Sequence, residues 1–124
     1  MRIGELSRAT GLSTATLRYY ERLGLLSKPE RRGGKRWYDG RGLNRARMLR
    51  AGRVAGLTIA DLVRLTRNSG DQEQRRAVLH DRRGNIDLEI GRLERKRELL
   101  QLASSCGCER IEACSIFGAV DERR

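Results

Sequence analysis

Aromatic residues, proline and histidine are scarce in this sequence. Aromatic residues make up 4% of the 124 residues, and the chain has one proline, Pro29, and one histidine, His80. So few large side chains predict a thin core, for which association with a second chain is a common remedy. No stretch is apolar and long enough to cross a membrane, and the first residues lack the apolar segment of a signal peptide. The sequence therefore predicts a cytoplasmic protein with no membrane partner.

Acidic residues are scarce in the first half of the chain. Residues 1–69 contain 16 Lys and Arg but 5 Asp and Glu, whereas residues 70–124 contain 11 of each. The whole formal net charge of +11 therefore belongs to the first segment. Positive charge gathered in one block is typical of proteins that bind a polyanion such as DNA. No Ser/His/Asp set, carboxylate pair or phosphate loop stands out, so the sequence does not predict an enzyme.

The first 26 residues have the pattern of a helix-turn-helix. Residues 3–10 form a short amphipathic segment, Gly11 turns the chain, and Ser13 can cap a second helix from Thr14 to Leu23. Two short helices joined by a Gly-containing turn define this motif. The second helix carries the side chains Arg18, Tyr19, Tyr20 and Arg22. Cations and phenols on one helix suit the major groove and its phosphate walls.

A β-hairpin wing is expected after the helix-turn-helix. The chain is rich in Arg and Gly from Glu30 to Lys35, and Gly33-Gly34 can form the turn between two short arms. Cations on such a wing suit phosphate contacts, although a solvated loop is the alternative. The full set of predicted DNA contacts is Ser13, Thr14, Arg18, Tyr19, Tyr20, Arg31, Lys35, Arg36 and Tyr38.

Two more helices complete the predicted DNA-binding domain, residues 1–70. Asp39 can cap a helix over residues 42–55, and Thr58 with Asp61 resembles a capping box for a helix that ends near Thr66. The apolar stripe of the first of these helices is expected to be Leu43, Ala46, Leu49 and Val54.

A single long helix is predicted over residues 71–104. Its apolar residues recur every seven positions, and charged residues flank them, which favours a two-stranded coiled coil over a solitary amphipathic helix. The residues expected to form the dimer seam are Leu79, Ile86, Ile90, Leu93 and Leu100. The predicted class is thus mainly α, with a winged helix-turn-helix, a dimerisation helix and a short loop over residues 105–124.

All three cysteines fall within this last loop, at Cys106, Cys108 and Cys114. In a reducing compartment, clustered thiols are more typical of metal ligation or redox chemistry than of structural disulfides. Thiolates are soft ligands that favour Cu(I), Zn and other thiophilic ions as well as Fe–S clusters. His80 lies several helical turns before the loop and is not expected to be a ligand within one chain.

These elements, in this order, resemble the MerR family of bacterial transcription regulators. The matching segments are Ile3-Gly4-Glu5-Leu6, Thr10-Gly11-Leu12, Leu17-Arg18-Tyr19-Tyr20-Glu21, Gly24-Leu25, Arg36-Trp37-Tyr38-Asp39 and Gly56-Leu57-Thr58-Ile59. The resemblance implies a homodimer with a winged helix-turn-helix at each end of an antiparallel coiled coil. It also implies binding to double-stranded promoter DNA, which the dimer bends and untwists so that RNA polymerase, an indirect partner, can engage the promoter. About 20 residues follow the coil, which implies the metal- or redox-sensing subclasses rather than a large drug-binding domain.

The resemblance leaves three ligand schemes open. The interval from Cys106 to Cys114 is similar to that of members that bind a monovalent ion such as Cu(I) through two thiolates. The Cys-Gly-Cys string is similar to that of the superoxide-response regulators, which hold a [2Fe–2S] cluster with four Cys, but Ala103 stands where the fourth is expected. A divalent site for Zn, Cd, Hg or Pb would use all three Cys, with Asp71 of the partner subunit as a candidate fourth ligand. The favoured reading is a regulator switched by a thiophilic metal ion, and the alternatives are a redox-responsive regulator and an architectural protein with a structural Zn site.

Overall fold

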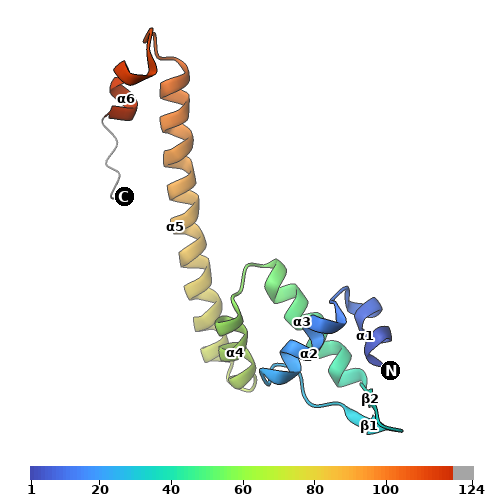
Figure 1. The fold of residues 1–124 in the computed structure, drawn as a ribbon. Coiled ribbons are helices and arrows are strands. Elements are labelled where there is room, and N and C mark those ends of the chain that lie inside the picture. The colour runs from blue at the N-terminus through green and yellow to red at the C-terminus, as the bar shows by residue number, and fades with distance from the viewer. Residues whose placement is uncertain (119–124) are drawn as a thin grey trace. The chain divides into compact units, whose positions relative to one another are not determined.

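The computed structural model describes residues 1–118, and the chain divides into two compact units, Met1–Arg82 and Arg83–Arg124. The first unit contains four short helices, a two-stranded sheet and the beginning of a long helix (Figure 1). The second contains the rest of that helix and the cysteine loop. This element order confirms the mainly α class predicted from the sequence.

The helix-turn-helix is formed by α1, Ile3–Thr10, and α2, Thr14–Arg22. Gly11 ends α1 with a φ of 76°, a left-handed conformation that favours glycine. The Ser13 hydroxyl oxygen accepts a hydrogen bond of 3.1 Å from the backbone N–H of Thr16, which confirms Ser13 as the cap of α2. The turn and the cap together fix the direction in which α2 leaves α1.

The wing is an antiparallel hairpin of β1, Glu30–Arg32, and β2, Lys35–Trp37. Gly33 and Gly34 both have positive φ, 58° and 77°, which is the backbone that a tight two-residue hairpin turn requires. After β2 the chain contacts its N-terminal residue: the backbone N–H of Tyr38 donates a 2.7 Å hydrogen bond to the carbonyl of Met1. The predicted hairpin is thus confirmed.

Helices α3, Gly40–Val54, and α4, Ile59–Arg67, pack behind the motif. Asp39 caps α3 through the N–H of Gly42, and the capping box of α4 forms as predicted. The buried core that α1 to α4 enclose consists of Leu6, Leu17, Tyr20, Leu25, Leu26, Tyr38, Ala46, Leu49, Leu57 and Leu62. Val54 is 78% exposed, so the prediction that it belongs to the apolar stripe is wrong: it lies at the solvent-facing end of α3.

Helix α5, Gln72–Ser104, is the longest element. Asp71 caps it by accepting a 3.1 Å hydrogen bond from the N–H of Gln74, and Val78 is buried within the first unit. Within the cysteine loop, a 3-10 turn covers Ile111–Ala113, and the short α6, Ser115–Gly118, ends the described chain. Among residues 1–118, no helix has the length and apolar character that crossing a membrane demands.

Candidate nucleic-acid interface and metal centre

Helix α2 has one face in the core and one face in solvent. Leu17 and Tyr20 are buried, whereas Arg18 is exposed and Tyr19 is 42% exposed. The guanidinium of Arg22 lies 5.8 Å from the centre of the Tyr19 ring, within the range of a cation–π contact. Arg18, Tyr19 and the exposed cap Ser13 are therefore available to a large partner, and Tyr20 is a core residue first.

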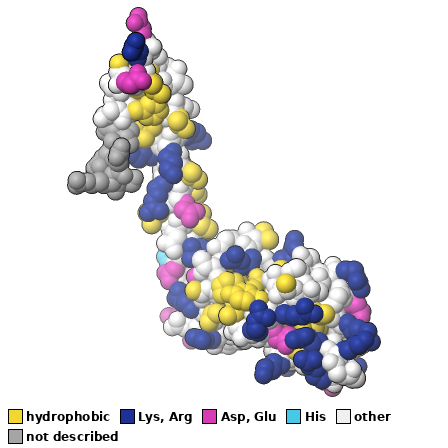
Figure 2. All heavy atoms as spheres, in the orientation of Figure 1, with side chains coloured by type: hydrophobic (Ala, Val, Ile, Leu, Met, Phe, Trp, Pro, Cys, Tyr) yellow, Lys and Arg dark blue, Asp and Glu magenta, His cyan; other side chains and the backbone are white. Residues whose placement is uncertain are grey.

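The wing presents cations to solvent. Arg31 and Lys35 are exposed, and Arg31 donates a 3.1 Å hydrogen bond to the carbonyl of Gly34 in the turn. The guanidinium of Arg32 lies 4.6 Å from the centre of the Trp37 ring. Figure 2 shows Lys and Arg side chains spread over the visible face of this unit, in agreement with the charge division along the sequence.

Glu21, on α2, joins the wing to that helix, a role that the sequence did not suggest. The Tyr38 hydroxyl donates a 3.1 Å hydrogen bond to Glu21 Oε2, and Arg36 Nε lies 3.2 Å from the same oxygen. Burial, together with the charge of Glu21, raises the pKa of Tyr38 to about 12. Arg36 and Tyr38 thus brace α2 against the end of β2. Whether they also contact phosphate stays a prediction, and Tyr38, 2% exposed, has little surface to offer.

The three cysteines form one cluster after the end of α5. Their sulfur atoms all lie within 4.8 Å of one another, although Cys108 is exposed and Cys114 is buried. The backbone N–H of Cys108 donates a 3.4 Å hydrogen bond to the Cys106 sulfur, and the 3-10 turn before Cys114 returns the chain to the other two. The loop therefore gathers the sulfurs that the sequence placed eight residues apart at most.

The thiols differ in acidity. Hydrogen bonds from the Cys108 thiol and backbone lower the pKa of Cys106. The same hydrogen bond to Cys106, with desolvation and the neighbouring thiols, raises the pKa of Cys108. Cys106 is therefore the first of the two to become a thiolate, which is the form that binds metals and reacts.

The donor set fits a thiophilic ion. Zn–S bonds of about 2.3 Å place thiolates around one ion roughly 3.8 to 4.0 Å apart, so the cluster needs only a small contraction to close on it. Among the described residues, the donors of this group are three sulfurs, which match the preference of soft ions. Among the described residues the cluster offers three donors, whereas a [2Fe–2S] cluster takes four.

The remaining predicted residues lie along α5. Asp71 is exposed at its start and acts there as a cap, and His80 is exposed within the first unit. Apolar side chains of the predicted seam face solvent in the single chain: Leu79, Ile90, Leu93 and Leu100 are exposed, and Ile86 is half-buried. Leu88 and Leu102, which do not follow the seven-residue spacing, are also exposed.

Comparison with known proteins identifies related regulatory proteins. A family model described as MerR HTH family regulatory protein matches residues 1–69. The nodulation protein NolA of Bradyrhizobium sp. (strain NC92) is 31% identical over 121 residues, 97% of this chain and 50% of NolA, so the chain spans about half the length of that relative. The mercuric resistance operon regulatory protein of Bacillus cereus is 34% identical over 101 residues, which cover 81% of this chain and 74% of that protein.

A solved structure resembles nearly the whole chain. The transcription regulator PbrR691 from Ralstonia metallidurans CH34, determined in complex with lead(II), matches with a TM-score of 0.73 and 28% sequence identity. The match covers 98% of this chain and 99% of PbrR691. The likeness therefore extends through α5 and the cysteine loop as well as the winged helix-turn-helix.

Proposed function

This chain belongs to the MerR family of helix-turn-helix regulatory proteins, and we propose that it is a transcription regulator switched by a thiophilic metal ion bound to Cys106, Cys108 and Cys114. The observation that carries the proposal is the convergence of three sulfurs within 4.8 Å in a chain whose other unit is a winged helix-turn-helix. Two relatives support it: one is a mercuric resistance regulator, and one was solved with lead(II).

We assign DNA binding to residues 1–70. Helix α2 would enter the major groove and present Ser13, Thr14, Arg18 and Tyr19, while Arg31 and Lys35 on the wing contact phosphates. Glu21, Arg36 and Tyr38 hold these two elements in a fixed relation through the contacts described above. The DNA partner is a promoter, and RNA polymerase is affected indirectly because it uses the same DNA.

We assign dimerisation to residues 71–104, because exposed apolar side chains along a helix of 33 residues favour a second copy as the covering partner. A two-fold dimer presents two recognition helices to a pseudo-palindromic site. Asp71 of the partner subunit stays a candidate fourth ligand to the ion.

The loop over residues 105–124 is the proposed sensor, and its last six residues lie outside the described chain. A bound thiophilic ion would tie three thiolates to one centre and so restrict the loop. Binding shifts the regulator only if the ion prefers the activating arrangement, because an ion of equal affinity for both states shifts nothing. Hg, Pb, Cd, Zn and Cu(I) all suit thiolates.

A second candidate is a thiol redox switch, favoured by the closeness of the sulfurs and the lowered pKa of Cys106. The Cys106 thiolate would attack a peroxide oxygen and form a sulfenic acid, with the peroxide reduced to water or an alcohol. A second thiol would then displace water and form a disulfide. Such a protein responds to peroxide and not to metal ions.

The deciding experiment is a titration of the anaerobically purified protein with Hg(II), Pb(II), Zn(II), Cd(II) and Cu(I), with transcription from its own promoter measured in parallel. We expect about one ion per cysteine cluster and a change in transcription that Cys106→Ser abolishes and Ser105→Ala, the adjacent control, does not. A response to peroxide but to none of the ions would transfer the function to the redox switch, and iron with inorganic sulfide in the purified protein would indicate a [2Fe–2S] cluster.

A further inference from the structure

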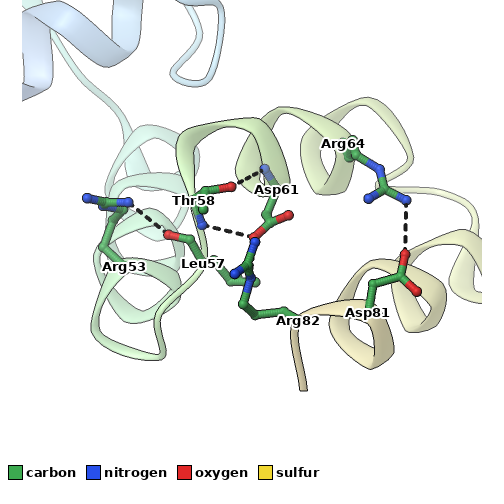
Figure 3. A network of polar contacts seen from close by, with 7 residues as sticks. All are labelled: Arg53, Leu57, Thr58, Asp61, Arg64, Asp81 and Arg82. Carbon is green, nitrogen blue, oxygen red and sulfur yellow. Dashed lines mark hydrogen bonds and ion pairs between the residues drawn. The ribbon is translucent and has the colours of Figure 1, made fainter. Parts of the chain in front are cut away.

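Two ion pairs join α4 to the beginning of α5 (Figure 3). In one pair the acidic residue lies on α4, and in the other it lies on α5. Asp61 on α4 pairs with Arg82 on α5 at 2.8 Å, and Arg64 on α4 pairs with Asp81 on α5 at 3.6 Å. The first pair is mostly enclosed, with side-chain exposures of 10% for Asp61 and 22% for Arg82. The second is half exposed or more, so solvent screens it and it contributes little. Of the two ion pairs, the one between Asp61 and Arg82 therefore contributes more to the contact between α4 and α5.

Asp61 takes part in the capping box of α4 as well as in the ion pair with Arg82. Its Oδ2 atom accepts a 2.9 Å hydrogen bond from the N–H of Thr58, and its own N–H donates to the Thr58 hydroxyl at 3.1 Å. Although burial opposes ionisation, the hydrogen bonds from Thr58 and Arg82 lower the pKa of Asp61. The same carboxylate thus caps α4 and contacts α5. A displacement of Arg82 would therefore disturb the first turn of α4 directly.

The contacts continue from α4 to the helix-turn-helix. Arg53 on α3 donates a 2.9 Å hydrogen bond to the carbonyl of Leu57, the residue before the capping box (Figure 3). The N–H of Leu57 in turn donates to the carbonyl of Gly52 at 2.9 Å. One turn earlier on α3, Arg50 donates to the carbonyl of Thr10, the last residue of α1. Two sets of polar contacts, joined through the backbone of α3, therefore lead from α5 to the turn that precedes α2.

Arg82 is the last residue of the first compact unit. We propose that it is a positioning residue: its pair with Asp61 fastens residues 72–82 to the DNA-binding unit, and the metal-induced change reaches the recognition helix through this pair. The second part rests on the proposed metal-switched function, whereas the first does not.

The test uses the full-length protein and the substitution Arg82→Gln. This substitution removes the positive charge but leaves the capping box of Thr58 and Asp61 intact. Arg83→Gln is the matched control, because it removes the same charge one residue later and, within residues 1–118, the Arg83 side chain forms no ion pair or hydrogen bond. Arg82→Lys is the conservative variant, because an ammonium group can still pair with Asp61.

The first measurement is hydrogen exchange of the metal-free proteins. We expect amides within residues 59–67 and 72–82 to exchange about tenfold faster in Arg82→Gln, since hydrogen bonds to charged groups are among the stronger ones. The exchange rates of Arg83→Gln should match those of the wild type. The rates of Arg82→Lys should lie between those of the wild type and those of Arg82→Gln. Equal exchange in Arg82→Gln and Arg83→Gln would overturn the proposed fastening.

The second measurement is the ratio of promoter activity with and without Hg(II) or Pb(II). We expect Arg82→Gln to bind the ion within about twofold of the wild type, and its activity ratio to fall by roughly 2- to 30-fold, the range found for residues that couple two sites. An unchanged ratio would overturn the proposed transmission. A wild type that binds no ion, or binds without changing transcription, would instead contradict the proposed function and with it the transmission, and hydrogen exchange would still decide the fastening.

Discussion

The two candidate sites of this chain differ in how completely their own residues hold them. In the DNA-binding unit, Tyr20 and Tyr38 are buried, and Glu21 binds the wing to the recognition helix. In the cysteine loop, the three sulfurs are close together, but Cys108 is exposed and only Cys114 is buried. The DNA-binding surface is therefore organised before its partner arrives, whereas the proposed sensor would be completed by its ligand.

The strongest way to break this comparison is to remove the core beneath the DNA-binding surface. Leu17 is fully buried under α2, so Leu17→Ala should lower the free energy of unfolding by about 2 to 5 kcal/mol and abolish promoter binding. Val54→Ala, at the exposed end of the neighbouring α3, should change stability by less than about 0.5 kcal/mol. Thermal denaturation followed by circular dichroism measures both. If the cysteine loop is an independent site, Leu17→Ala still takes up Hg(II); loss of that uptake would mean that the sensor needs the folded DNA-binding unit.

The reverse change removes a ligand and leaves the DNA-binding unit intact. Cys114→Ser and Cys108→Ser should each lower metal affinity by at least about 100-fold, since even groups that merely orient ligands cost 10- to 100-fold. Promoter affinity of the metal-free protein should stay unchanged. Competition with a chelator of known affinity and a DNA-binding titration are the two measurements. Near-normal metal binding by Cys108→Ser alone would indicate a two-coordinate site formed by Cys106 and Cys114.

The outward face of α2 provides a smaller effect within the organised surface. Arg18 is exposed in the free protein, so Arg18→Ala should weaken promoter binding by about 1 to 3 kcal/mol while stability and metal affinity remain those of the wild type. Binding titrations at several salt concentrations separate a base contact from a phosphate contact, because loss of a phosphate contact also reduces the salt dependence. Wild-type affinity in this variant would show that Arg18 does not contact the promoter.

Local signals in the sequence were sufficient for most of the fold. The Ser13 cap, the Gly33-Gly34 turn and the Thr58–Asp61 capping box each depend on neighbours in the chain, and each formed as predicted. Three cysteines within nine residues likewise indicated the cluster. Local patterns carry no information on contacts between distant elements, which is why the pairs of Glu21 with Tyr38 and of Asp61 with Arg82 were missed.

The contact between Glu21 and Tyr38 also predicts how the DNA-binding unit responds to alkaline pH. The folded protein raises the pKa of Tyr38 from about 10 to about 12, so in that interval the folded state keeps a proton that the unfolded state has lost. The stabilisation is complete below pH 10 and decreases as the pH rises toward 12.

Glu21→Gln removes the anion beside the hydroxyl, so the pKa of Tyr38 should fall toward its ordinary value, although burial keeps it somewhat raised. Ultraviolet titration of the tyrosines in both proteins, with denaturation at pH 9 and pH 11, measures the difference, and Glu5→Gln on α1 is the matched control. Identical titration of Glu21→Gln and the wild type would mean that burial alone sets the acidity of Tyr38, and that Glu21 does not brace the wing in solution.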